Sequence, residues 1–127
     1  MRTIIRWAVA GLFAAAPLVM SAPAAQAGSG DVIRTGSCSG ASDWKLKLSP
    51  EDGRIEVEFE VDSNVAGQTW QVRLTKNGNQ IFSGARVTRG ASGSFELRRV
   101  TSDPAGDDVF RARATHAGEV CAGSATF

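Results

Sequence analysis

The chain has 127 residues, of which 43% are hydrophobic, and its 14 basic residues nearly balance 13 acidic ones. This length suits a single domain with a modest core, and the near-neutral charge leaves no overall positive field that would draw the protein onto nucleic acid or an anionic membrane. Two cysteines and one histidine are too few soft ligands for a structural zinc site.

The first 27 residues predict a secretory signal peptide. Arg2 and Arg6 precede the apolar stretch "AVAGLFAAAPLVM", and the small residues of "AQA" end at Ala27, where we expect cleavage. The apolar stretch is shorter than the roughly 20 residues that a membrane span needs, although an uncleaved anchor is the alternative. We therefore expect loss of residues 1–27 and a single secreted, extracellular domain at residues 28–127, with 12 basic and 13 acidic residues and a net charge of −1.

Cys38 and Cys121 lie near the two ends of that domain. Because exported proteins meet oxidising conditions, we expect these two cysteines to form a disulfide that joins the start of the domain to its end. Two free thiols, or a disulfide between two copies of the chain, are the alternatives.

Hydrophobic and polar residues alternate along almost every segment after residue 30, which predicts seven or eight short β-strands. In chain order the segments are one within 31–40, then 44–48, 54–62, 69–75, 80–84, 94–100, 109–115 and 120–127. Turn sequences separate them, and no helical periodicity is present. This pattern predicts an all-β fold, an antiparallel β-sandwich.

Local signals refine the strand boundaries. "SPEDG" predicts the turn of a first hairpin, and Asn77-Gly78 predicts the tight turn of a second. In "SFELRRV" the alternation slips at Arg98-Arg99, so we expect a β-bulge there that returns Val100 to the core face. Trp44 and Trp70 fall on the inward faces of their strands, although an exposed Trp44 that stacks on a ligand is the alternative for the first of them.

The segment "RIEVEFEVD" places four acids on the outer face of one strand. They are Glu56, Glu58, Glu60 and Asp62. We expect Lys45 and Lys47 on one neighbouring strand and Arg98 on the other to neutralise this row. A docking stripe for a basic partner protein is the alternative, whereas a straight row of side chains about 6.5–7 Å apart does not converge on a metal ion.

No constellation of residues predicts catalysis. His116 is expected at the tip of a hairpin, without a neighbouring nucleophile or orienting group. Asp103, Asp107 and Asp108 lack the spacing of a calcium loop and predict a capped turn. We therefore expect neither enzymatic activity nor a cofactor or bound metal.

The order of these segments resembles that of immunoglobulin and fibronectin type III domains. Trp70 in "TWQVRL" is similar to the tryptophan of the third main strand of these families, and "DPAGDDVFRARA" is similar to the approach to the sixth, with Phe110 in place of a tyrosine. Ala112 stands where an immunoglobulin domain has a cysteine, so a Cys38–Cys121 bridge would differ from theirs. The whole pattern also resembles a group of small secreted actinobacterial proteins of unknown function, which implies secretion, one disulfide and an immunoglobulin-like sandwich.

Together these features predict a monomeric, secreted binding domain whose partner is a protein or the cell envelope, without binding to nucleic acid and without stable membrane insertion. Ile81 and Phe82 are adjacent, so strict alternation sends one of them outward, where it would contribute to an apolar binding patch. A small-molecule carrier similar to the apo-chromoproteins of the neocarzinostatin kind, a secreted protease inhibitor and an enzyme built around His116 are the alternative functions.

Overall fold

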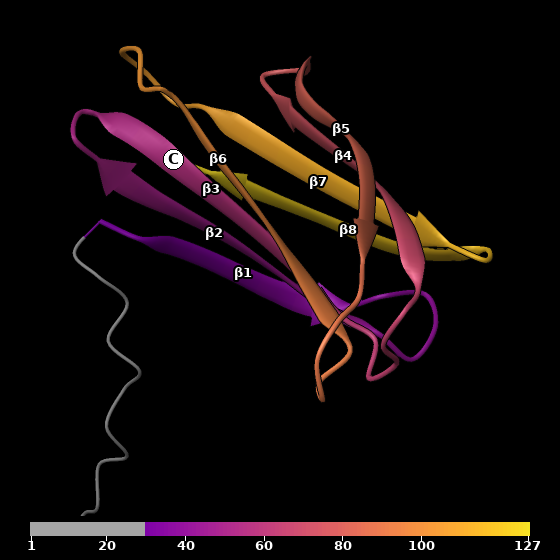
Figure 1. The fold of residues 1–127 in the computed structure, drawn as a ribbon. Helices are drawn as coiled ribbons and strands as arrows, with labels where there is room; N and C mark the ends of the chain where they lie inside the picture. The colour runs from indigo at the N-terminus through magenta and orange to yellow at the C-terminus, as the bar shows by residue number, and fades with distance from the viewer. Residues whose placement is uncertain (1–29) are drawn as a thin grey trace, which may run out of the picture.

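Eight β-strands and no helix make up the part of the chain that the structure describes, residues 30–127 of a computed structural model (Figure 1). The strands are β1 (Val32–Ser37), β2 (Asp43–Glu51), β3 (Arg54–Asp62), β4 (Thr69–Lys76), β5 (Asn79–Val87), β6 (Ser94–Ser102), β7 (Val109–His116) and β8 (Glu119–Thr126). The predicted signal peptide lies outside these described residues. Within them, no helix has the length and hydropathy to cross a membrane.

The strands form two four-stranded antiparallel sheets that face each other. One sheet has the order β1-β2-β3-β6, which we call the first sheet, and the other has the order β5-β4-β7-β8, the second sheet. Strands β1 and β2, β2 and β3, β4 and β5, and β7 and β8 pair as hairpins, while the other connections cross between the two layers seen in Figure 1. The predicted antiparallel β-sandwich is therefore confirmed.

The hairpins β2–β3, β4–β5 and β7–β8 each turn over two residues. Asp52-Gly53, Asn77-Gly78 and Ala117-Gly118 have positive φ at both positions, which is the backbone of the type I′ turn that matches the twist of paired strands. The predicted turn at Asn77-Gly78 is confirmed. The first turn is shorter than "SPEDG", because residues 49–51 continue β2 and pair with β3.

The core lies between the sheets and is made of the alternate residues of both. Trp70 is fully buried, and its ring lies 6.4 Å from that of Phe95, which in turn meets Phe59 edge-on. The buried hydrophobic residues are Leu46, Leu48, Ile55, Val57, Phe59, Val61, Trp70, Val72, Leu74, Phe95, Leu97, Phe110, Ala112, Ala114, Cys121 and Ala125. They confirm the period-two pattern as the source of the fold.

The disulfide joins the two sheets at one edge of the sandwich. Cys38 follows β1 and Cys121 lies within β8, and the two sulfur atoms are bonded. Among the described residues no cysteine is left free, so the predicted bridge is confirmed. It closes a segment with a sequence separation of 83 residues and thereby ties the beginning of the domain to its last strand.

The predicted β-bulge at Arg98-Arg99 is wrong. Strand β6 pairs with β3 in continuous register, so Arg99 keeps an inward position, and its guanidinium lies 4.7 Å from the ring centre of Phe82. A long aliphatic stem allows arginine to occupy such a position at the border of a core while its charge stays near water. The irregularity is in β5 instead, where Ile81 is an extra residue opposite β4.

Candidate functional site

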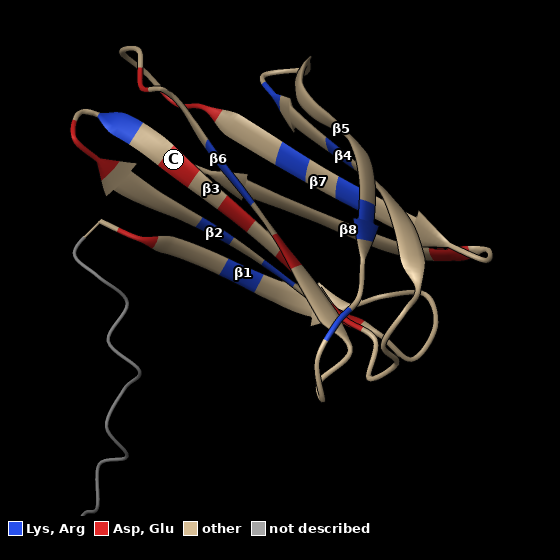
Figure 2. Cartoon of the chain, in the orientation of Figure 1, with Lys and Arg blue, Asp and Glu red and all other residues tan. Residues whose placement is uncertain are grey.

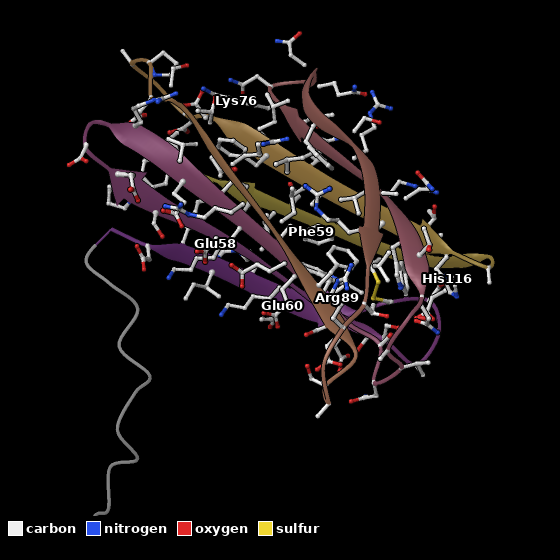
Figure 3. All side chains as sticks on the ribbon, viewed as in Figure 1. Glu58, Phe59, Glu60, Lys76, Arg89 and His116 are labelled. Atoms are coloured by element: carbon white, nitrogen blue, oxygen red, sulfur yellow. A yellow bond between two sulfur atoms is a disulfide. The ribbon has the colours of Figure 1, made fainter. Side chains whose placement is uncertain are left out.

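The predicted row of acids lies on the outer face of β3. Figure 2 shows these acidic positions as red bands along the strand, and Figure 3 shows Glu58 and Glu60 with Phe59, which is fully buried between the sheets. Across the first sheet, Glu58 pairs with Lys47 on one side and with Arg98 on the other. The expected basic neighbours of the row are therefore confirmed.

Glu56 is the most constrained member of this row. Its carboxylate is largely buried and accepts a hydrogen bond of 2.6 Å from Arg98, which also lies 3.6 Å from Glu51. The bond from Arg98 holds the pKa of Glu56 well below its usual range. Hydrogen bonding with Glu56 raises the pKa of Glu51 and of Glu58. The row thus forms an internally paired network, and its use as a docking stripe stays a prediction.

One of the three carboxylates in the loop before β7, that of Asp108, has a structural partner. Asp108 is buried, and its Oδ1 accepts a hydrogen bond of 2.8 Å from Asn77, whose own Oδ1 accepts one from the backbone N–H of Val109. Asp103 and Asp107 are exposed. This arrangement confirms a capped turn, which fixes the end of the β4–β5 hairpin against the start of β7.

His116 is the last residue of β7, so its predicted place in the turn itself is wrong. Figure 3 shows it at the end of the second sheet, where its ring lies 5.3 Å from that of Trp70. Its Nδ1 is 2.8 Å from the carbonyl oxygen of Thr69. The side chain is half-buried and packs against the indole of Trp70.

The expected apolar patch at Ile81 and Phe82 is not formed. Both side chains are half-buried and pack against the core, because the extra residue in β5 interrupts the alternation that would have sent one of them outward. The guanidinium of Arg86 lies 4.7 Å from the ring centre of Phe82 and covers it further. Among the described residues, Val65 is the only large hydrophobic side chain that is exposed. A role of Ile81 and Phe82 in partner binding stays a prediction.

The outer face of the second sheet carries three arginines that the sequence interpretation did not single out. Arg73 on β4 and Arg113 on β7 are direct partners across the two strands, and Arg111 lies two residues before Arg113 on the same face. Directly opposed side chains have Cβ atoms about 4.5–5.5 Å apart, and alternate residues of one strand lie about 6.5–7 Å apart. The three arginines therefore start from neighbouring positions on one face of the sheet, and all three line the same groove.

No acidic residue balances these arginines on their own face. Strands β4, β5 and β7 contain neither aspartate nor glutamate, as the blue bands of β7 in Figure 2 illustrate. The one acid of β8, Glu119, accepts a hydrogen bond from the backbone of Ser42 beyond the edge of the sheet. Within residues 30–127, none of the three arginines takes part in an ion pair.

A groove of about 1050 Å³ opens beside the arginines, and we call it the arginine groove. Its lining residues are Trp44, Arg73, Thr75, Asn77, Gly78, Val109, Arg111, Ala112, Arg113, Ala122, Gly123 and Ser124. The hollow arises because β8 presents only the small residues 122–124 beside the long arginines of β7. Trp44 reaches the groove because its indole lies against Gly123, which has no side chain to cover it.

The alternating segments "TWQVRLT" and "VFRARAT" already place these arginines on outward faces. The sequence could not show that the two segments pair with each other, since 35 or more residues separate the paired positions. A search of protein-family models, curated proteins and solved structures found no match to this chain. The geometry of the groove therefore carries the functional argument.

Proposed function

We propose that the chain is an exported, non-enzymatic binding domain that acts as a monomer and recognises a protein or the cell envelope. The binding surface is the arginine groove. The observation that carries this proposal is the placement of Arg73, Arg111 and Arg113 side by side, with no acid on the same face. Like charges directly opposite each other destabilise a sheet, so the fold gains nothing from this arrangement, whereas a bound anionic partner would relieve the repulsion.

The acid row of β3 is the weaker candidate surface. Glu56 is largely buried and forms an ion pair with Arg98, while Glu58 and Glu60 lie opposite Lys47 and Lys45 across the sheet. A partner would have to break or share these pairs to bind. The arginines of the second sheet offer their donors without such competition.

The disulfide supports export, and two buried aromatic residues support the resemblance to immunoglobulin and fibronectin type III domains. A bridge between Cys38 and Cys121 suits a domain that works outside the cell. Trp70 and Phe110 are both fully buried in the second sheet, as the resemblance to immunoglobulin and fibronectin type III domains implies. Because this architecture serves many functions, the site rather than the fold identifies the activity.

Co-sedimentation with isolated cell envelopes of the producing organism tests the proposal. The variant with Arg73→Gln, Arg111→Gln and Arg113→Gln should lose binding that the oxidised wild-type domain shows. Lys45→Gln is the matched control, since it removes a positive charge from the opposite sheet. If the wild type stays in the supernatant and captures no component of the culture fluid, or if the triple variant binds as the wild type does, the proposal fails.

A small-molecule carrier is the second candidate function. The groove of about 1050 Å³ is large enough for a small organic ligand. It lies on the face of a sheet, however, and not between loops as expected for a carrier. Mass spectrometry of the purified domain under non-denaturing conditions would reveal a retained small molecule and so favour the carrier.

The structure gives less support to a protease inhibitor, a further alternative. The loop after Cys38 closes at once, because the N–H of Cys38 donates to the carbonyl of Ser42. Ser39 exchanges hydrogen bonds with Val120 of β8. The loop is a compact turn and does not present the extended segment that a protease would engage.

A further inference from the structure

We infer that the arginine groove binds a phosphorylated ligand, with the phosphoryl group among Arg73, Arg111 and Arg113 and the organic part along β8 toward Trp44. This inference rests on the proposed function and adds the chemistry of the ligand. The phosphoryl group could belong to a polymer of the envelope, a lipid headgroup or a soluble metabolite. What these sources share is a phosphate monoester, which carries close to two negative charges at neutral pH, attached to an organic group.

The first argument is the number of charges and donors. One guanidinium can satisfy both oxygens of a carboxylate through a bidentate pair of hydrogen bonds. Three neighbouring guanidiniums would leave two charges unmatched around such a ligand. A phosphate monoester carries a charge between −1.5 and −2 at neutral pH and presents three acceptor oxygens, so it suits the cluster of three better.

The second argument is the absence of competing acceptors. Strands β4 and β7 carry no acid, and Thr75, opposite Arg111, contributes only a neutral hydroxyl to the groove. The donors of Arg73 and Arg113 are therefore not occupied by carboxylates of the described chain. A phosphate entering the groove would replace water and not a protein partner.

The third argument is the apolar side of the groove. Beyond the arginines the lining includes Val109, Ala122 and Gly123, and the half-buried indole of Trp44 lies at Gly123. An inorganic phosphate would leave this part of the groove empty. A flat or apolar organic group could cover it and contribute contact area that the phosphate alone does not have.

Nuclear magnetic resonance titration of the oxidised domain tests the inference with three probes: phenyl phosphate, inorganic phosphate and benzenesulfonate. Phenyl phosphate should bind most tightly at about pH 7.5 and shift the amide signals of β4, β7 and β8. Arg113→Gln should weaken its binding about tenfold or more, as expected for the loss of a hydrogen bond to a charged group. Lys45→Gln should bind like the wild type.

The pH dependence separates phosphate from other anions. Phenyl phosphate loses its second charge below a pKa of about 6, whereas benzenesulfonate keeps one charge throughout. Lowering the pH from about 7.5 to about 5 should therefore weaken the binding of phenyl phosphate several-fold and leave benzenesulfonate unchanged. The lining of the groove contains no histidine or carboxylate, so its own charge stays constant over this range.

Three results would overturn the inference: no signal shifts on β4, β7 and β8 with phenyl phosphate, equal binding by wild type and Arg113→Gln, or equal affinity for phenyl phosphate and benzenesulfonate at both pH values. If envelope binding still depends on the arginines in any of these cases, the proposed function stands and only the phosphate assignment fails. If neither envelope binding nor phenyl phosphate binding depends on the arginines, the groove is not a binding site.

Discussion

Substitution of Gly123 by alanine should destabilise the domain, because the indole of Trp44 occupies the space that a side chain would need. A Cβ atom on Gly123 would lie 2.7 Å from Cη2 and 2.8 Å from Cε3 of the ring, well inside normal contact distance. The ring has little room to move away, because its other edge lies against the backbone of Gly36 of β1. A Cβ built on Gly36 would be 2.7 Å from that edge. The indole is thus held between the edges of the two sheets.

Overpacking of this kind lowers the free energy of unfolding by about 1–3 kcal/mol. Replacing glycine by alanine also reduces the conformational entropy of the unfolded chain, which offsets about 0.4–1 kcal/mol of this loss. We expect Gly123→Ala to lower the free energy of unfolding by about 1–2 kcal/mol. At this domain size each kcal/mol corresponds to about 4–8 °C in Tm. Urea and thermal unfolding followed by far-ultraviolet circular dichroism measure both quantities.

A second variant separates the steric contact from any effect of the glycine itself. Trp44→Leu removes the ring, so adding Gly123→Ala to it should cost much less than in the wild type, which a double-mutant cycle would show as a favourable coupling. Ser124→Ala, on the outer face of β8, serves as the control and should change stability little. If Gly123→Ala is as stable as the wild type, or if its cost is the same without the ring, the indole is not wedged as described.

Three further predictions concern the bridge and the charges. Replacing Cys38 and Cys121 by serine should lower the free energy of unfolding by about 4.5 kcal/mol on the chain-entropy model for a loop of 83 residues, and the wild type should resist alkylation until it is reduced. Arg113→Gln should raise stability by a few tenths of a kcal/mol at low salt, because it removes a like charge opposite another, and the gain should vanish in high salt; a loss of stability would contradict this. Glu56 has a lowered pKa in the fold, so it contributes stability above its ordinary value of 4.5 and loses that contribution as the pH falls below it. Glu56→Gln should therefore be less stable than the wild type at about pH 7 and lose less stability in acid, which urea unfolding at several pH values would check.

The features that could be predicted from the sequence were those that depend on neighbours along the chain. Alternation fixed the inward side of "TWQVRLT" and therefore the burial of Trp70, and Asn77-Gly78 fixed a tight turn through its tolerance of positive φ. The positions of Lys47 opposite Glu58 and of Lys45 opposite Glu60 could also be predicted, because the length of a hairpin turn sets the register of its two strands. These signals depend only on residues close together in the sequence, so they do not require knowledge of how distant segments pair.

The features that were missed depend on how distant segments meet. The slip at Arg98-Arg99 suggested a bulge only because arginine was counted as outward-facing, whereas the stem of Arg99 extends toward Phe82 across the border of the sandwich. The adjacent Ile81 and Phe82 do break the alternation of their own segment, but this break predicted an exposed residue and not the bulge that the structure has. The arginine groove exists because β4 pairs with β7 and because β8 brings small residues beside them, and a single sequence gives no register for either pairing.

The charge distribution has a consequence for how the domain meets other molecules. The first sheet carries more acids than bases on its outer face, while the second carries only arginines, so the molecule has a positive and a negative side although residues 28–127 are nearly neutral overall. Such a dipole orients an approaching anion toward the groove and makes its association rate sensitive to salt. The same dipole could draw one copy onto another, head to tail, in an open chain of contacts. Arg98 opposes this through its ion pair with Glu56, and the neighbouring Lys45 and Lys47 reduce the negative charge that a second arginine face would meet. The register of the first sheet thus places basic residues beside the acid row, whereas the arginines of the second sheet have no acid on their own strands β4 and β7.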